Sequence, residues 1–87
     1  MSDYVEKSLP MLVTYDAEAD ATYIQVAAAI ADGEATRQVE CDLGDTEGTV
    51  ILDFNNEGRL LGVEILGASV LLPNNLLIEL TVNTNRP

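Results

Sequence analysis

Twelve residues near the middle of the chain have the spacing of a calcium-binding loop. The stretch 53–64 reads DFNNEGRLLGVE, with oxygen-bearing side chains at its positions 1, 3, 5 and 12 and Gly58 at its position 6. This nearly matches the loop of an EF-hand, whose oxygen ligands surround the ion. Position 5 carries Glu57, where the pattern has Asp or Asn. The same letters also fit a tight turn between two strands.

The segments on either side of this stretch favour the turn. An EF-hand needs a helix before and after its loop, but TVILDF (49–54) and RLLGVEIL (59–66) are rich in β-branched and aliphatic residues at a period of two. NNEG (55–58) between them has the length of a hairpin connection, with Gly58 available for a positive φ. In a hairpin, Glu64 lies about 20 Å from Gly58, too far to close a cage around an ion. The sequence therefore predicts a hairpin and no calcium.

A second group of carboxylates follows the first predicted strand. Asp16, Glu18 and Asp20 alternate in DAEAD, so in an extended chain all three would face one side and attract a divalent cation. The alternative is a solvated turn in which Asp16 and Asp20 accept hydrogen bonds from nearby backbone N–H groups. We favour the turn, and the question of cation binding stays open.

The amino-acid composition offers few of the side chains that enzymes commonly use for catalysis. The chain has no histidine, the commonest general base and zinc ligand, so Ser-His and Cys-His nucleophile arrangements are excluded within it. Its one cysteine, Cys41, cannot form an internal disulfide. An enzyme using Asp16, Asp20 or Glu64 with a metal is the least favoured function. We predict that the protein is not an enzyme and has no catalytic, cofactor-binding or metal-binding residues.

Acidity is the strongest compositional signal. The chain has 15 acidic and 4 basic residues, a net charge of −11. This field repels nucleic-acid phosphates, speeds encounter with a basic protein and favours solubility. No apolar run approaches the roughly 20 residues of a membrane span, and residues 1–10 lack the apolar core of a signal peptide. We expect a cytoplasmic protein with no nucleic-acid or membrane partner.

Six segments have the composition of short strands joined by turn-length links. They are 11–15, 21–27, 36–42, 49–54, 59–66 and 76–82. In 36–42 the residues alternate, which places Arg37, Val39 and Cys41 on one face. The predicted fold class is mainly β (α+β at most): an antiparallel meander of five to six short strands, with a short helical turn near 67–72. We expect one domain, 1–87.

Two motifs in this order resemble a known family. They are YDAEADATYIQV (15–26) and VILDFNNEGRLLGVEILGAS (50–69). Together they are similar to the domain of unknown function (DUF) 2283 family of small bacterial and archaeal proteins. The resemblance covers 11–72 and leaves a C-terminal extension, 73–87, outside the pattern; Glu57-Gly58 replaces the family's Asp-Gly. It implies a small β-rich fold, no established activity and, from members encoded beside toxin-like proteins, an antitoxin-like role.

The motif residues have physical explanations that need no reaction. Asp53 and Arg59 flank the turn closely enough to pair across it. Gly62 permits a bulge or close packing over an aromatic neighbour. Glu64 is expected to pair with Arg37 or Arg59, or to line a site. The tyrosines are expected to be packing residues with hydrogen-bonded hydroxyls: Tyr4, Tyr15 and Tyr23.

These observations favour a small acidic β-rich protein-binding module that self-associates, as a homo-oligomer such as a dimer. A thin sheet exposes its edges and one face, and the apolar segment 76–82 adds further surface for a partner. The alternative is an antitoxin-like inhibitor of a basic toxin or nuclease, because the net charge would attract a basic protein. A carboxylate metal-dependent enzyme comes last.

Overall fold

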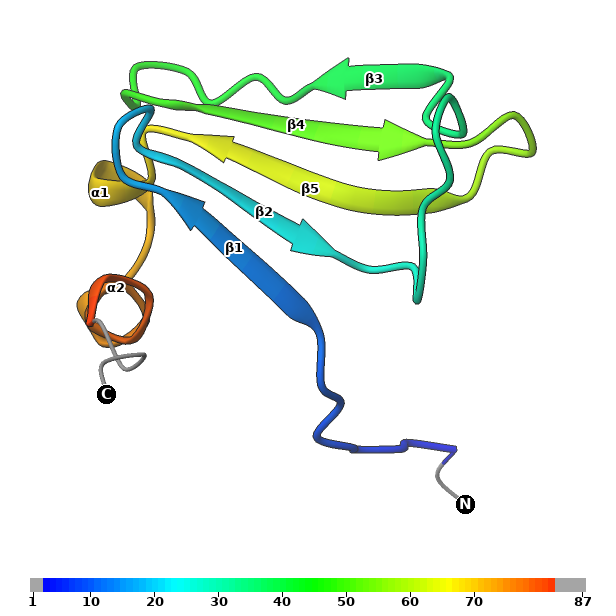
Figure 1. The fold of residues 1–87 in the computed structure, drawn as a ribbon, viewed down its shortest axis with the longest axis horizontal. Coiled ribbons are helices and arrows are strands. Elements are labelled where there is room, and N and C mark those ends of the chain that lie inside the picture. Colours follow the sequence, from blue (N-terminus) through cyan, green and yellow to red (C-terminus); the bar gives the residue numbers. More distant parts are fainter. Residues whose placement is uncertain (1–2, 83–87) are drawn as a thin grey trace.

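A five-stranded sheet forms the body of the protein in the computed structural model, which describes residues 3–82. The strands are β1 (Leu12–Asp16), β2 (Ala21–Gln25), β3 (Arg37–Glu40), β4 (Thr49–Phe54) and β5 (Leu60–Leu66), and they precede the helices α1 (Ala68–Leu71) and α2 (Asn74–Thr81). All neighbouring strands are antiparallel. This confirms the predicted mainly β fold with a short helical turn near 67–72 (Figure 1).

The strand order is β1-β2-β5-β4-β3, so the last strand lies in the middle of the sheet. A strictly sequential meander would place β3 beside β2. Instead, the connection 26–36 crosses one end of the sheet and starts β3 at the far edge (Figure 1). The central position gives β5, at seven residues the longest strand, hydrogen-bonding neighbours on both sides. An edge strand would leave one row of its backbone groups unpaired.

The stretch with calcium-loop spacing is a hairpin turn. The side-chain oxygen of Asn55 accepts hydrogen bonds from the backbone N–H groups of Glu57 and Arg59, both at 2.9 Å. Gly58 has φ 79° and donates its N–H to the carbonyl of Asn55. The side chain of Asn55 therefore supports the turn, and β4 and β5 continue from it as antiparallel strands.

The prediction of a strand over 76–82 is wrong, because this segment belongs to the helix α2 (Asn74–Thr81). Three leucines of one helical face are half-buried: Leu76, Leu77 and Leu80. Their spacing of one and three residues is that of a helix face. Pro73, extended at the N-cap, starts the helix where its missing N–H costs nothing. The helix lies beside β1 (Figure 1), and residues 83–87 of the predicted extension lie outside the described residues.

The register divides the side chains of the sheet between two faces. One, the apolar face, carries Val13, Tyr15, Thr22, Ile24, Arg37, Val39, Cys41, Val50, Leu52, Phe54, Leu61, Val63 and Ile65. The other, the polar face, carries Leu12, Thr14, Asp16, Ala21, Tyr23, Gln25, Gln38, Glu40, Thr49, Ile51, Asp53, Gly62, Glu64 and Leu66. The predicted alternation in 36–42, 49–54 and 59–66 is confirmed.

The apolar face is only partly covered. Among residues 3–82, the hydrophobic side chains that are fully buried are those of Leu61, Ile65 and Ala68. Both helices lie at one end of the sheet and leave β3 and most of β4 uncovered (Figure 1). The radius of gyration is 15.0 Å, against about 12 Å for a compact domain of this length. No helix of the described residues is long and apolar enough to cross a bilayer.

We expect Gly58→Ala to lower the free energy of unfolding by about 1 kcal/mol, because a side chain at a φ of 79° is strained. Nothing lies within 4 Å of the added Cβ, so the backbone strain acts alone. Urea unfolding followed by circular dichroism measures the change. The control is Glu57→Ala at the exposed neighbouring position, which we expect to change stability by less than about 0.5 kcal/mol. Equal midpoints for the two variants would contradict the turn.

Candidate functional site

The polar face has one nearly buried carboxylate, that of Asp53 on β4, which is 8% exposed. The hydroxyl of Tyr23, from β2, donates a hydrogen bond to its Oδ2 at 3.1 Å. The side-chain amide of Gln38, from β3, donates to its Oδ1 at 3.0 Å. Residues of three strands therefore converge on one carboxylate, and we call Tyr23, Gln38 and Asp53 the polar cluster.

Gly62 on the central strand makes this convergence possible. It is the cross-strand partner of both Gln25 and Asp53, so it lies between β2 and β4 on the polar face. A Cβ at this position would overlap the hydroxyl and ring carbons of Tyr23. The tyrosine ring thus crosses β5 directly above Gly62 to reach Asp53. This confirms the expected close packing of Gly62 against an aromatic side chain.

The environment of Tyr23 keeps its phenol protonated. Burial raises the pKa of Tyr23 to about 12, assisted by the hydrogen bond to Asp53 and by the negative charges of Asp53 and Glu64. At neutral pH the hydroxyl is therefore a hydrogen-bond donor, and it is a poor proton acceptor. With both oxygens of Asp53 bonded to neutral donors, the polar cluster ties β2 and β3 to β4 across the sheet.

A shallow hollow lies next to the polar cluster. It has a volume of about 280 Å³, and its polar side chains include those of Thr14, Asp16, Tyr23 and Glu64. A protonated phenol and carboxylates around open space can bind a polar or cationic group. Among the residues that line the hollow, no activated nucleophile is paired with a base.

The DAEAD carboxylates take different partners. Asp16 accepts hydrogen bonds from the N–H groups of Glu18 and Ala19, at 3.0 and 3.3 Å, which confirms the predicted turn for this residue. Asp20 was expected to do the same, but its carboxylate bonds to the distant Ser69. Within residues 3–82, no group of three or more Asp, Glu, Cys or His side chains is placed to hold a metal ion.

Hydrogen bonds to Asp20 connect the turn between β1 and β2 to the start of α1. The carboxylate of Asp20 accepts the backbone N–H of Ser69 at 3.0 Å, the hydroxyl of Ser69 at 2.6 Å and the hydroxyl of Tyr15 at 3.0 Å. Its carbonyl accepts the N–H groups of Gly67 and Ala68, both at 2.9 Å. The hydrogen bonds from Ser69, the hydroxyl's above all, lower the pKa of Asp20, with Tyr15 adding to the effect and desolvation opposing it.

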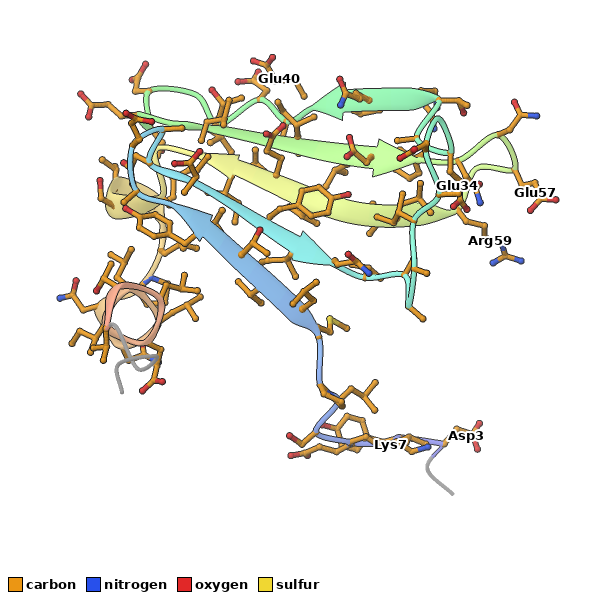
Figure 2. All side chains as sticks on the ribbon, in the orientation of Figure 1. Asp3, Lys7, Glu34, Glu40, Glu57 and Arg59 are labelled. Carbon is orange, nitrogen blue, oxygen red and sulfur yellow. The ribbon has the colours of Figure 1, made fainter. Side chains whose placement is uncertain are left out.

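The basic residues do not take the partners expected from the sequence. Arg37 stacks on the ring of Phe54, 4.7 Å from its centroid, on the apolar face and therefore opposite Glu64. Asp53 bonds to Tyr23 and Gln38 in place of Arg59. Figure 2 shows Arg59 projecting outward from the hairpin turn. The register on opposite faces explains the first difference, and the neutral donors around Asp53 explain the second.

We expect Gly62→Ala to lower the free energy of unfolding by about 1–3 kcal/mol, because the added methyl group occupies the space of the Tyr23 phenol. The same change in a Tyr23→Val background should cost less, since the ring is then absent. A double-mutant cycle measured by urea unfolding gives this coupling. Additive effects of the two substitutions would contradict the contact.

The lowered pKa of Asp20 predicts a loss of stability in acid. A carboxyl group with a lower pKa in the folded state stabilises the fold above its ordinary value of 3.8, and this contribution disappears as the pH falls through the folded value. Asp20→Asn should lower the melting temperature at pH 7 and weaken its decline between pH 4 and pH 2. Thermal unfolding across this range, with Glu18→Gln as the control, measures both effects. If the melting temperatures of the wild type and of both variants declined equally with falling pH, the result would contradict the role of Asp20.

Comparison with known proteins identifies a family but no activity. Neither a curated protein nor a solved structure matches the chain. The family described as "Protein of unknown function (DUF2283)" matches residues 12–69, which include all five strands and the start of α1. This match spans more than half of the chain and contains the polar cluster, Gly62 and both ends of the Asp20–Ser69 connection. The protein therefore belongs to the DUF2283 family.

Proposed function

We propose that the protein is a binding module that associates with itself, as a dimer whose copies pack through the apolar face. The single observation behind this proposal is that, within residues 3–82, no second layer covers the apolar face over most of β3 and β4 (Figure 1). A sheet hydrophobic on one face is stable only when that face is buried against another element. A second copy would supply that layer. The role is one of binding, without a reaction.

The surface area supports this proposal. The chain exposes 6770 Å², whereas a compact monomer of its mass exposes about 5,000 Å². The extended segment before β1 accounts for part of the excess. The larger area is in keeping with a sheet that, within the described residues, lacks a covering layer over much of one face (Figure 1).

The distribution of charge also supports it. The chain has 15 acidic residues, and none occupies a position on the apolar face. The one charged residue of that face is Arg37, which covers the ring of Phe54. Two copies could therefore meet without bringing carboxylates into contact, although each has a net charge of −11. We place this module in the cytoplasm, where Cys41 on the same face would stay reduced.

Sedimentation equilibrium should show a dimer at micromolar concentration, and Val39→Lys should raise its dissociation constant roughly a hundredfold, since each copy loses a buried valine. Val39 lies on the edge strand β3, so the isolated fold should tolerate the change. The control is Glu40→Lys, at the next residue of β3, whose side chain lies on the opposite face. This change should alter the dimer dissociation constant by less than about threefold. A monomeric wild type at 100 µM would refute the proposal.

A second candidate function uses the opposite face. The polar face carries four acidic residues and no basic one: Asp16, Glu40, Asp53 and Glu64. A basic protein would be attracted to this face, in keeping with an antitoxin-like role. The two proposals are compatible, because they use opposite sides of one sheet.

For the second candidate, a basic protein should be retained by the tagged wild type in 50 mM salt and released in 500 mM salt, because screening weakens charge attraction. The Glu40→Gln, Glu64→Gln double variant should retain less of it. Affinity isolation from the native host, followed by mass spectrometry, makes the comparison. Equal retention by wild type and variant would exclude the polar face as the binding surface.

A further inference from the structure

We propose that residues 3–11, the N-terminal arm, lie across the apolar face of the partner in the dimer. This inference rests on the self-association proposed above and adds the segment that completes the interface. The arm leaves the sheet at the start of β1 and runs away from it (Figure 1). All nine of its residues are exposed. Its apolar side chains include Val5, Leu9 and Met11, at 69%, 64% and 48% exposure.

The local sequence keeps the arm from folding back at its base. Pro10 fixes its own φ and disfavours helical backbone at Leu9, so the chain stays extended where it joins β1. Figure 2 shows the side chains of Asp3 and Lys7 far from the body of the sheet. Burial of the exposed Val5, Leu9 and Met11 would be favourable. The apolar face offers side chains that are themselves only half-buried, among them Val39 and Leu52.

The dimensions of the arm and the sheet agree. Nine extended residues reach about 30 Å, at about 3.3 Å per residue. The five strands, at about 4.8 Å between neighbours, make a sheet about 19 Å across. An arm is therefore long enough to cross all the strands of a partner. In a two-fold symmetric dimer both arms would do so, each covering the sheet of the other copy.

The charges of the arm and the face are complementary. The arm carries Asp3, Glu6 and Lys7, a net charge of −1. The only charged residue on the apolar face is Arg37, which is exposed at the start of β3. An acidic residue of the arm can therefore pair with Arg37 of the partner, while the aliphatic side chains of the arm contact Val39, Leu52 and their neighbours.

The first test compares two substitutions in adjacent arm residues by sedimentation equilibrium. Leu9→Asp should raise the dimer dissociation constant at least thirtyfold, because the change occurs twice in each dimer. Ser8→Asp adds the same charge at a polar position, and we expect less than a threefold effect. A dimeric wild type with equal constants for both variants would overturn the arm inference and leave the proposed dimer standing. A monomeric wild type would overturn both.

The second test identifies what the arm touches. Photoactivation of the full chain carrying Leu9→p-benzoylphenylalanine should give a covalent dimer, with residue 9 attached to a peptide of the other copy from residues 37–66. Mixing copies with light and heavy isotopes distinguishes links between chains from links within one chain. An adduct within one chain would show that the arm folds onto its own sheet, and would overturn the inference even if the protein is dimeric. A monomer without adducts would overturn both proposals.

Discussion

The pairing of β5 with both β2 and β4 holds the sheet together. Without it, the β1–β2 hairpin would be separate from β3 and β4, because the connection 26–36 brings no strand next to β2. The same pairing aligns Ile24, Val63 and Leu52 in one row across three strands, and so makes the apolar face continuous. On the other face it places Gly62 between Tyr23 and Asp53, which permits the contact between β2 and β4.

A single sheet of this size cannot bury both of its faces. The two helices are short and lie at one end, so residues 3–82 do not provide the second layer that domains ordinarily have. The polar cluster and the Asp20–Ser69 connection fix the shape of the sheet by hydrogen bonds, in place of a deep core. The described part of the molecule is thus connected by hydrogen bonds across its polar side and only partly covered on its apolar side.

Local pattern predicted the strands, their faces and the hairpin at Gly58. Alternation at a period of two determines which side of a strand each residue occupies, so Arg37, Val39 and Cys41 were placed correctly before their neighbours were known. The apolar run in 76–82 fits both a short strand and a helix face, and its period alone could not separate them. Pro73, three residues before this run and directly before Asn74, was the signal for the start of the helix.

Contacts between residues far apart in the chain could not be predicted from the sequence. Tyr23 and Asp53 are 30 residues apart, and Asp20 and Ser69 are 49 apart. Each pair depends on β5 entering the middle of the sheet, which no local pattern indicates. The calcium-like spacing of 53–64 has a similar explanation, since Asn55 supports the turn and Asp53 bonds within the polar cluster. The residues that match the calcium-loop pattern therefore have two separate structural roles, one in the hairpin turn and one in the polar cluster.

The two edges of the sheet set a limit on how copies can join. The outer strand β1 has α2 beside it, and the opposite outer strand, β3, has only four residues. Neither edge offers a long, flat row of unpaired backbone groups, which is what open-ended strand-by-strand polymerisation requires. Growth into fibres is thereby discouraged, even though each chain presents so much hydrophobic surface. The edges therefore offer little for strand-by-strand addition of further copies.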